Sequence, residues 1–310
     1  MSELLAPPAG FRIGHWTDAV GRTGCTVVIA PEGTRGGVDV RGGGPGTRET
    51  DVVGPLAGTD RVSAVMLAGG SAYGLAAADG AMRWLEEHGI GYPTPAALVP
   101  IVPAAIAYDL AEGDATARPT AESGYAACEE AREGVPERGR VGAGTGTAAG
   151  KVLGRGAATA SGVGYASERG GFGSTVAALA VANPFGDVLA EDGSVLAGPK
   201  SDGAPRTIEF IAALDRAPTD EELEARNTSL VCVMTEATLD KAQCGRVARA
   251  ASAGVARAVE PVFTDVDGDV VFCLASGEGK AAGRFEVLQL ETLAARVTAE
   301  AIRDAVVSAN

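Results

Sequence analysis

The chain has 310 residues, of which 46% are hydrophobic, and its formal net charge is −14. This hydrophobic content is enough for a sizeable core. The acidic balance argues against nucleic acids and anionic membranes as partners, because both bind clustered Lys and Arg. The first residues, MSELLAPPAGFRIGHW, lack the pattern of a signal peptide, and no apolar run approaches the ~18 residues of a membrane span. Five cysteines without a CxxC pair are typical of reduced thiols, so we expect a soluble, cytoplasmic protein.

Hydrophobic periodicity predicts strands and helices that alternate along the chain. In chain order, the expected elements are strands at Cys25–Ala30 and Val62–Ala68, helices at Ala72–His88, after Pro103 in PAAIAYDL and at Thr120–Glu133, strands at Ser174–Asn183 and Leu230–Thr235, a helix at Leu239–Val259, a strand at Val270–Ala275 and a helix at Phe285–Ser308. Ser71 is the expected N-cap of the first helix, and His88 is expected to cap its other end. Residues 191–226, rich in Gly, Pro and acidic side chains, are the expected linker. The alternation favours an α/β protein in which helices cover sheets.

A glycine-rich stretch, GAGTGTAAGK, covers Gly142–Lys151. A Walker A motif would need glycine where the chain has Thr145, and Ser or Thr where it has Val152. The glycine spacing also differs from that of a dinucleotide-binding loop. Two interpretations stay open, a tight turn for backbone packing and a turn that brings backbone close to a reaction centre near Lys151. A nucleotide-binding enzyme is a third hypothesis.

The acidic stretch DVDGD (Asp265–Asp269) resembles the start of a calcium loop. Its glycine falls at the fourth position and Ser276 stands at the twelfth, so it does not match an EF-hand, and we expect no calcium. An Asp-Gly hairpin turn before the strand VVFCLA would explain the stretch. The alternative is a pair of carboxylates, Asp267 and Asp269, directed at a polar partner.

The two histidines, His15 and His88, have no Cys or acidic residue at metal-ligand spacing, so we expect no metal site. The chain also lacks the Gly-x-Ser-x-Gly motif of a nucleophile elbow. Conventional hydrolysis through a Ser-His-Asp triad is therefore not supported.

The residues Asn227-Thr228-Ser229 stand between an acidic, loop-like run and the apolar strand LVCVMT. A plain strand start would need no function. A hydroxyl residue at this point also fits a precursor that cleaves itself. A cut before Thr228 would free its α-amine, whose pKa near about 8 is low enough for the amine to act as the base for its own hydroxyl. Such a chain would be an amidase without a catalytic histidine.

Several longer stretches resemble one family, in the same order and over almost the whole chain. They are FRIGHWTDAVGRTGCTVVIA, GVDVRGGGPGTRETD, VMLAGGSAYGLAAADG, VPIVPAAIAYDL, GRVGAGTGTAAGK, VANPFGDV, ARNTSLVCVMTEATLDKAQC and DGDVVFCLASG. The family comprises the L-aminopeptidase/D-Ala-esterase-amidases, the β-aminopeptidases and the endo-type nylon-oligomer hydrolases. The resemblance implies an α-β-β-α sandwich that is similar to the N-terminal nucleophile hydrolases but differs in connectivity. It also implies a single catalytic domain over residues 1–310, a small peptide or amide substrate, no cofactor, and a homo-oligomer of four or more copies.

Residue by residue, the resemblance implies cleavage between Asn227 and Thr228 into segments 1–227 and 228–310, with Thr228 as the nucleophile. The other matching positions are Lys151 (an active-site lysine), Asn183 (an asparagine suited to hold the oxyanion), Tyr108 (a substrate-contacting tyrosine) and the acidic pair Asp267 and Asp269.

The chain departs from one branch of this family. The β-aminopeptidases have a Ser nucleophile and a Ser/Glu pair where this chain has Thr228, Asp267 and Asp269. Its site residues therefore resemble most closely those of the 6-aminohexanoate-oligomer hydrolases. The competing hypothesis is an unprocessed, non-catalytic member of the same fold that serves as a binding or scaffold protein.

Overall fold

Two five-stranded sheets form the middle of the molecule in the computed structural model, which describes residues 4–201, 203–216 and 227–310. The strands of the first sheet, in spatial order, are β1 (Arg12–Asp18), β2 (Thr23–Ile29), β5 (Ala64–Ala68), β8 (Ala104–Ile106) and β4 (Thr47–Arg48). Those of the second are β11 (Val163–Arg169), β12 (Thr175–Asn183), β15 (Thr228–Thr235), β17 (Val270–Ala275) and β3 (Arg35–Val40).

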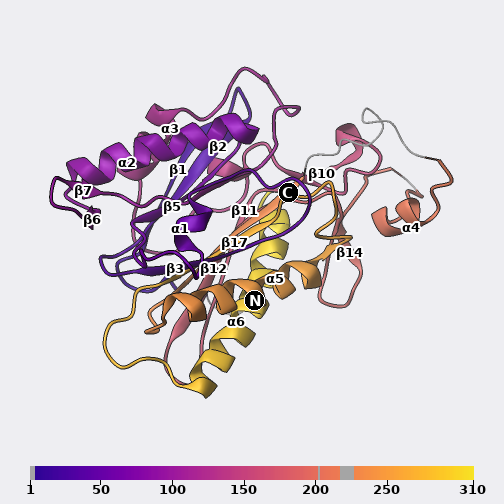
Figure 1. Cartoon of the computed structure of the whole chain (residues 1–310). Helices are drawn as coiled ribbons and strands as arrows, with labels where there is room; N and C mark the ends of the chain where they lie inside the picture. The colour runs from indigo at the N-terminus through magenta and orange to yellow at the C-terminus, as the bar shows by residue number, and fades with distance from the viewer. Residues whose placement is uncertain (1–3, 202, 217–226) are drawn as a thin grey trace.

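Helices cover the outer face of each sheet (Figure 1). The first sheet packs against α2 (Ala77–Glu87) and α3 (Ala121–Glu129), and the second against α5 (Lys241–Ala258) and α6 (Arg284–Val307). The layers therefore follow the order helix, sheet, sheet, helix, as expected for the α-β-β-α sandwich.

Smaller elements lie outside the two main sheets and their helices. They are the helices α1 (Thr50–Val53) and α4 (Thr207–Ala212), the 3-10 turns η1 (Ser71–Ala76), η2 (Gly142–Gly144) and η3 (Arg155–Ala157), the pairs β6–β7 (Tyr92–Pro93, Leu98–Val99) and β9–β10 (Ala148–Ala149, Thr159–Ala160), and the sheet of β13 (Asp187–Leu189), β14 (Val195–Ala197) and β16 (Val259–Glu260).

A separate apolar core fills each space between two layers. Side chains alternate along β12, which is buried throughout: Leu179 and Val181 face the core between the sheets, and Ala178 and Ala180 face α5 and α6. Small residues on the helix side allow close packing. At Gly164 of β11, for example, a Cβ atom would lie only 2.0 Å from the carbonyl oxygen of Ala301 in α6. The high Gly and Ala content therefore reflects tightly packed layers.

Two local predictions were wrong in the first half of the chain. The segment after Pro103 was expected to be helical, but Ala104–Ile106 form β8 and pair in parallel with Met66–Ala68. Tertiary strand pairing has overridden a local sequence that favours a helix. Ser71 is not an N-cap: it lies within η1 with a φ of 54°, and regular helix begins only at Ala77. His88 does lie at the C-cap of α2, as predicted.

Two further differences lie in the second half of the chain. The expected linker at residues 191–226 contains β14 and α4, and its residues 202 and 217–226 lie outside the described residues. The Asp267-Gly268 turn does not make a hairpin, because β17 pairs with β15 in parallel and with β3 in antiparallel orientation. The turn is instead the point where the chain enters β17 beside the start of β15.

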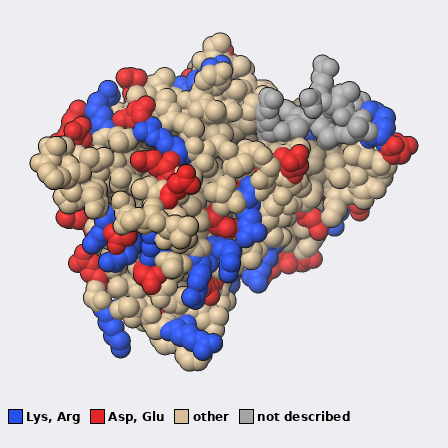
Figure 2. Space-filling model, in the orientation of Figure 1, with Lys and Arg blue, Asp and Glu red and all other residues tan. Residues whose placement is uncertain are grey.

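The surface carries both signs of charge. Figure 2 shows acidic and basic side chains interspersed over one face of the molecule. Among the described residues, no helix has the length and the apolar character required to cross a membrane.

Candidate active site

Strand register brings two predicted site residues together. In the antiparallel pairing of β12 with β15, Asn183 lies opposite Thr228. Thr228 shares a face of β15 with Leu230, which packs between the sheets, whereas Ser229 shares the opposite face with Val231. The same alternation along β12 places Asn183 with the inter-sheet layer. Thr228, and not Ser229, is therefore the hydroxyl residue on the side of Asn183.

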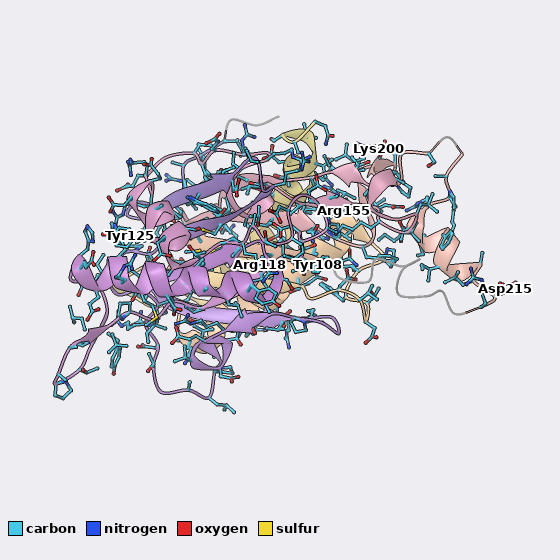
Figure 3. The ribbon with its side chains drawn as sticks, turned by 90° about the horizontal axis from the view of Figure 1, so that it is seen from above. Tyr108, Arg118, Tyr125, Arg155, Lys200 and Asp215 are labelled. Atoms are coloured by element: carbon cyan, nitrogen blue, oxygen red, sulfur yellow. The ribbon has the colours of Figure 1, made fainter. Side chains whose placement is uncertain are left out.

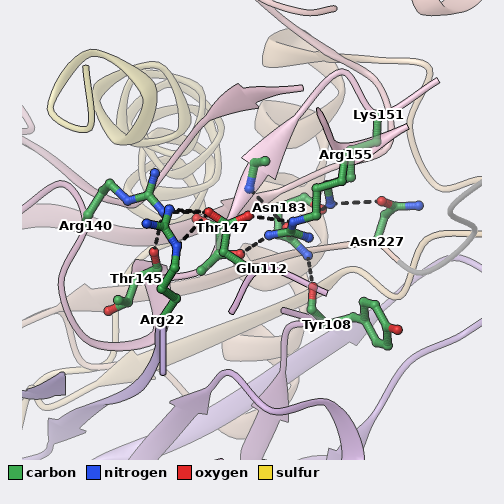
Figure 4. A network of polar contacts seen from close by, with 12 residues as sticks. Arg22, Tyr108, Glu112, Arg140, Thr145, Thr147, Lys151, Arg155, Asn183 and Asn227 are labelled. Carbon is green, nitrogen blue, oxygen red and sulfur yellow. Dashed lines mark hydrogen bonds and ion pairs between the residues drawn. The ribbon is translucent and has the colours of Figure 1, made fainter. Parts of the chain in front are cut away.

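Lys151 is completely buried, which is rare for an amine. Its Nζ donates to the backbone oxygen of Asn183 at 2.8 Å, to Oδ1 of Asn183 at 2.7 Å and to Oδ1 of Asn227 at 2.9 Å (Figure 4). Three acceptors match the three hydrogens of an ammonium group. Amide oxygens of Asn183 and of Asn227, the residue before the candidate cleavage point, thus solvate a buried positive charge.

The carbonyl oxygen of Asn227 lies between two donors. The Thr228 Oγ1 hydroxyl donates to it at 2.6 Å, and the Gly268 N–H donates to it at 2.8 Å. The hydroxyl is therefore adjacent to the peptide group that a cleavage before Thr228 would break. Gly268 was not predicted as a site residue, because a backbone N–H donor leaves no signal in the sequence.

The two aspartates lie beside the start of β15, on the side of β17, and differ in their surroundings. Asp267 forms a parallel bridge with Asn227 and accepts from the Thr264 hydroxyl at 2.6 Å and from the Thr264 N–H at 3.1 Å. Asp269 accepts from the Ser229 N–H through Oδ1 at 2.5 Å. Burial, together with the nearby charge of Asp267, raises the pKa of Asp269 to about 7. The Asp269 carboxyl near the candidate cleavage point therefore keeps its proton to higher pH than an ordinary aspartate.

The amide of Asn183 connects the site to Tyr108. Its Nδ2 donates to the Tyr108 carbonyl oxygen at 3.0 Å, while its Oδ1 also accepts from the Ala148 N–H at 3.2 Å. An amide nitrogen carries two N–H groups, so Asn183 can hold the Tyr108 segment and still donate once more. The Tyr108 side chain is partly exposed, and in the view from above it lies near the middle of the molecule (Figure 3).

A second polar cluster borders this network. The carboxylate of Glu112, four residues after Tyr108, accepts hydrogen bonds from Arg22, Arg140 and Arg155 (Figure 4). Sequence reasoning did not find Glu112, because its partners are scattered along the chain.

Metal ligands are not grouped in this way. Within residues 4–201, 203–216 and 227–310, no set of three or more His, Cys, Asp or Glu side chains is arranged to hold a metal ion. His15 contacts the Thr26 hydroxyl through Nδ1 at 2.9 Å, and burial lowers its pKa to about 4. The imidazole is therefore neutral at neutral pH and takes part in none of the site contacts described above.

The chain is similar to known proteins over nearly its full length. The family model described as Peptidase family S58 matches residues 8–310, which is nearly the full chain. The chain belongs to peptidase family S58. An uncharacterized aminopeptidase of Mycobacterium leprae is 43% identical over 305 residues, covering 90% of this chain and 80% of the relative. A 6-aminohexanoate-oligomer endohydrolase of Agromyces sp. is 31% identical over 312 residues, which cover 97% of this chain and 84% of the relative.

Solved structures show the same fold for this S58 chain. The L-aminopeptidase D-Ala-esterase/amidase of Ochrobactrum anthropi, described as a variant of the Ntn hydrolase fold, superposes with a TM-score of 0.74 at 20% identity, covering 97% of this chain and 85% of that structure. A β-aminopeptidase of Burkholderia sp. superposes with a TM-score of 0.73 at 22% identity and has the same coverage of both chains. Family and fold together support a peptide or amide hydrolase with the α/β fold of these structures.

Proposed function

We propose that this S58 chain is a self-processing amide hydrolase with Thr228 as its nucleophile. The observation that carries the proposal is the position of the Asn227 carbonyl oxygen, 2.6 Å from Thr228 Oγ1 and 2.8 Å from the Gly268 nitrogen. A hydroxyl and a backbone N–H around one carbonyl are the components of acyl transfer, in which the hydroxyl attacks and the N–H stabilises the oxyanion.

Self-cleavage would proceed as an acyl shift. Thr228 Oγ attacks the Asn227 carbonyl carbon, the peptide nitrogen leaves with a proton, and an ester joins the two residues. Water then opens the ester, which gives an Asn227 carboxylate and a free Thr228 α-amine. The methyl group of Thr restricts its χ1 angle and so helps to hold Oγ against the carbonyl.

In the processed enzyme, the freed α-amine would act as the base for Thr228 Oγ during attack on a substrate amide. The neighbouring Lys151 ammonium favours the uncharged form of that amine by repulsion between like charges. Lys151 would also stabilise negative charge on the oxyanion, and Asn183 would supply a further donor, a contribution of about 3 kcal/mol for one oxyanion-hole group. Asp267 and Asp269 would orient the Thr228 ammonium and hydroxyl, and Tyr108 would contact the substrate.

The substrate class follows from the relatives. We assign a small peptide or amide, with 6-aminohexanoate oligomers as the first compounds to test, because Thr228 and the two aspartates match the residues expected for that branch and a relative of that name covers most of the chain. We further propose a cytoplasmic homo-oligomer of four or more copies, which light scattering after size-exclusion chromatography would measure.

Denaturing gel electrophoresis with N-terminal sequencing tests the proposal. Division of the 31.0 kDa chain at Thr228 gives expected fragments of about 23 and 8 kDa, the smaller starting Thr-Ser-Leu-Val. Thr228→Ala should remain one folded chain without activity, and Ser229→Ala, the matched control one residue along, should still be cut. A single wild-type band at full length would support the non-catalytic alternative instead. A fragment that starts Ser-Leu-Val would show that Thr228 is the wrong nucleophile.

A further inference from the structure

Glu112 is the meeting point of three arginines from separate parts of the chain. Its Oε1 accepts from Arg22 Nε at 3.0 Å and from Arg140 Nη2 at 2.9 Å, and its Oε2 accepts from Arg155 Nε at 2.8 Å. Arg22 lies in the turn between β1 and β2, Arg140 precedes η2, and Arg155 begins η3. One carboxylate thus ties three segments to the loop that follows β8.

Two of these arginines also hold the glycine-rich turn that leads to Lys151. Arg140 Nη2 donates to the Thr145 carbonyl oxygen at 2.9 Å, and Arg155 Nη2 donates to the carbonyl oxygen of Gly146. The turn continues through Ala148, whose N–H donates to Asn183 Oδ1. Glu112 is therefore connected to one side of the Asn183 amide through backbone carbonyls.

The other side of the same amide is connected to Glu112 along the chain. Asn183 Nδ2 donates to the Tyr108 carbonyl, and Glu112 follows in the same loop. The amide of Asn183, which binds Lys151, is thus held between two segments that both converge on Glu112 (Figure 4).

The cluster is strongly ionic and well shielded. The Glu112 side chain is 16% exposed and that of Arg155 only 10%. Although burial opposes ionisation, the hydrogen bonds from Arg155, Arg22 and Arg140 hold the pKa of Glu112 down to about 2. Without this carboxylate, three guanidinium groups would repel one another and release the carbonyls that two of them hold.

We propose that Glu112 is a positioning residue that fixes Asn183 and Lys151 against the Thr228 hydroxyl. The proposal rests on the proposed function, since it assigns Glu112 a part in that same reaction. The hydrogen bonds of the Glu112 carboxylate go to Arg22, Arg140 and Arg155, so Glu112 acts by holding the Tyr108 loop and the glycine-rich turn at a fixed separation. A loss of this bracing should lower the rate of both self-cleavage and substrate hydrolysis.

The test compares Glu112→Gln with Asp304→Asn in the full chain. Asp304 lies on α6 and pairs with Arg138 at 2.7 Å. The Asp304 side chain is 12% exposed and that of Arg138 is 30% exposed, so this ion pair is shielded from solvent to a similar degree. We expect both variants to lose thermal stability, and Glu112→Gln to lose at least as much, because it releases three arginines where Asp304→Asn releases one. Only Glu112→Gln should slow processing and lower kcat, by about tenfold or more, with KM within twofold of wild type.

The pH profile supplies a readout that a merely structural role would not move. Removal of the Glu112 charge leaves the arginines uncompensated, and their positive potential favours the uncharged Thr228 α-amine. The acid limb of the kcat profile should therefore move to lower pH, by roughly half a pH unit. The second variant is Arg22→Gln, which removes the most exposed of the three arginines. Its kcat should decrease less than that of Glu112→Gln. The acid limb of its kcat profile should move to higher pH, because a positive charge is lost.

The outcomes separate the two proposals. Wild-type kcat and an unmoved acid limb in folded Glu112→Gln, with at least the stability loss of Asp304→Asn, would overturn the positioning role while leaving the hydrolase intact. An uncut and inactive wild-type chain would instead overturn the proposed function itself.

Discussion

The two halves of the candidate active site differ in how completely their polar atoms are satisfied. On the side before the cleavage point, Lys151 Nζ has three oxygen acceptors within 2.9 Å, and both polar atoms of the Asn183 amide have partners. On the side after it, Asp269 Oδ1 accepts from Ser229 N–H, but Oδ2 has no hydrogen-bond partner of normal geometry among the described residues. The protein thus solvates the buried Lys151 ammonium more completely than the Asp269 carboxyl group.

This difference assigns the halves different tasks. A buried charge that is fully hydrogen-bonded keeps its ionisation state and its position, and so serves as a frame. A buried carboxylate with an unsatisfied oxygen gains or loses a proton near neutral pH, as the raised pKa of Asp269 indicates. The first half should fix geometry, and the second should respond to pH.

Lys151→Met should have the largest effect, because it removes the charge of the frame and keeps most of its volume. The variant leaves the oxygens of Asn183 and Asn227 without their buried donor, at a cost of about 1–3 kcal/mol in stability. We expect kcat to fall by about 10²-fold or more, by comparison with the loss of one oxyanion-hole donor. Circular dichroism would establish the fold before kinetics are measured. A folded variant with wild-type turnover would return Lys151 to a packing role.

Asp269→Asn should show the response to pH directly as a change in stability. Because the folded state raises this pKa from 3.8 to about 7, stability is full at acidic pH and is lost as pH rises through that range, by up to about 4 kcal/mol. Asparagine never ionises, so the variant avoids the loss. Both chains would carry Thr228→Ala, which keeps them uncut. The difference in melting temperature should favour Asn and widen from pH 5 to pH 8, and a constant difference would contradict the prediction.

Thr228→Ser should have a smaller effect, since it keeps the hydroxyl between the two halves and removes only the methyl group. Oγ then samples additional χ1 rotamers, so self-cleavage and hydrolysis should slow by roughly 3–10-fold. Timed denaturing gels would measure the first rate and an amide assay the second. A complete loss of both would show that the methyl group is essential to the site.

Treatment with EDTA should have the smallest effect. Neither half gathers a set of metal ligands in the described part of the chain. Structural and catalytic metal sites require three or four protein ligands. The rates of hydrolysis before and after chelation should therefore agree within about twofold. Activity that EDTA abolished and zinc restored would contradict the mechanism proposed for both halves.

Sequence reasoning identified the residues of the site better than the contacts among them. Lys151, Asn227 and Thr228 stood out in their motifs, and Asn183 was implied by the family resemblance. The structure joins all four in one network. The donor at Gly268 and the brace at Glu112 were missed. A backbone N–H has no residue signature, and the three arginines that bind Glu112 come from positions scattered over more than 130 residues of the chain.

The sequence by itself determined the buried strands, the long amphipathic helices and the hydroxyl at the mouth of β15, because these depend on residue type and short-range periodicity. Only the tertiary structure decided that the residues after Pro103 form a strand, since that choice depends on pairing with β5 some forty residues earlier. It likewise decided that Asp267-Gly268 enters β17 beside Asn227 rather than closing a hairpin. Parallel pairing of β15 with β17 is a contact between distant parts of the chain, and the geometry around the Asn227 carbonyl exists only once that contact has formed.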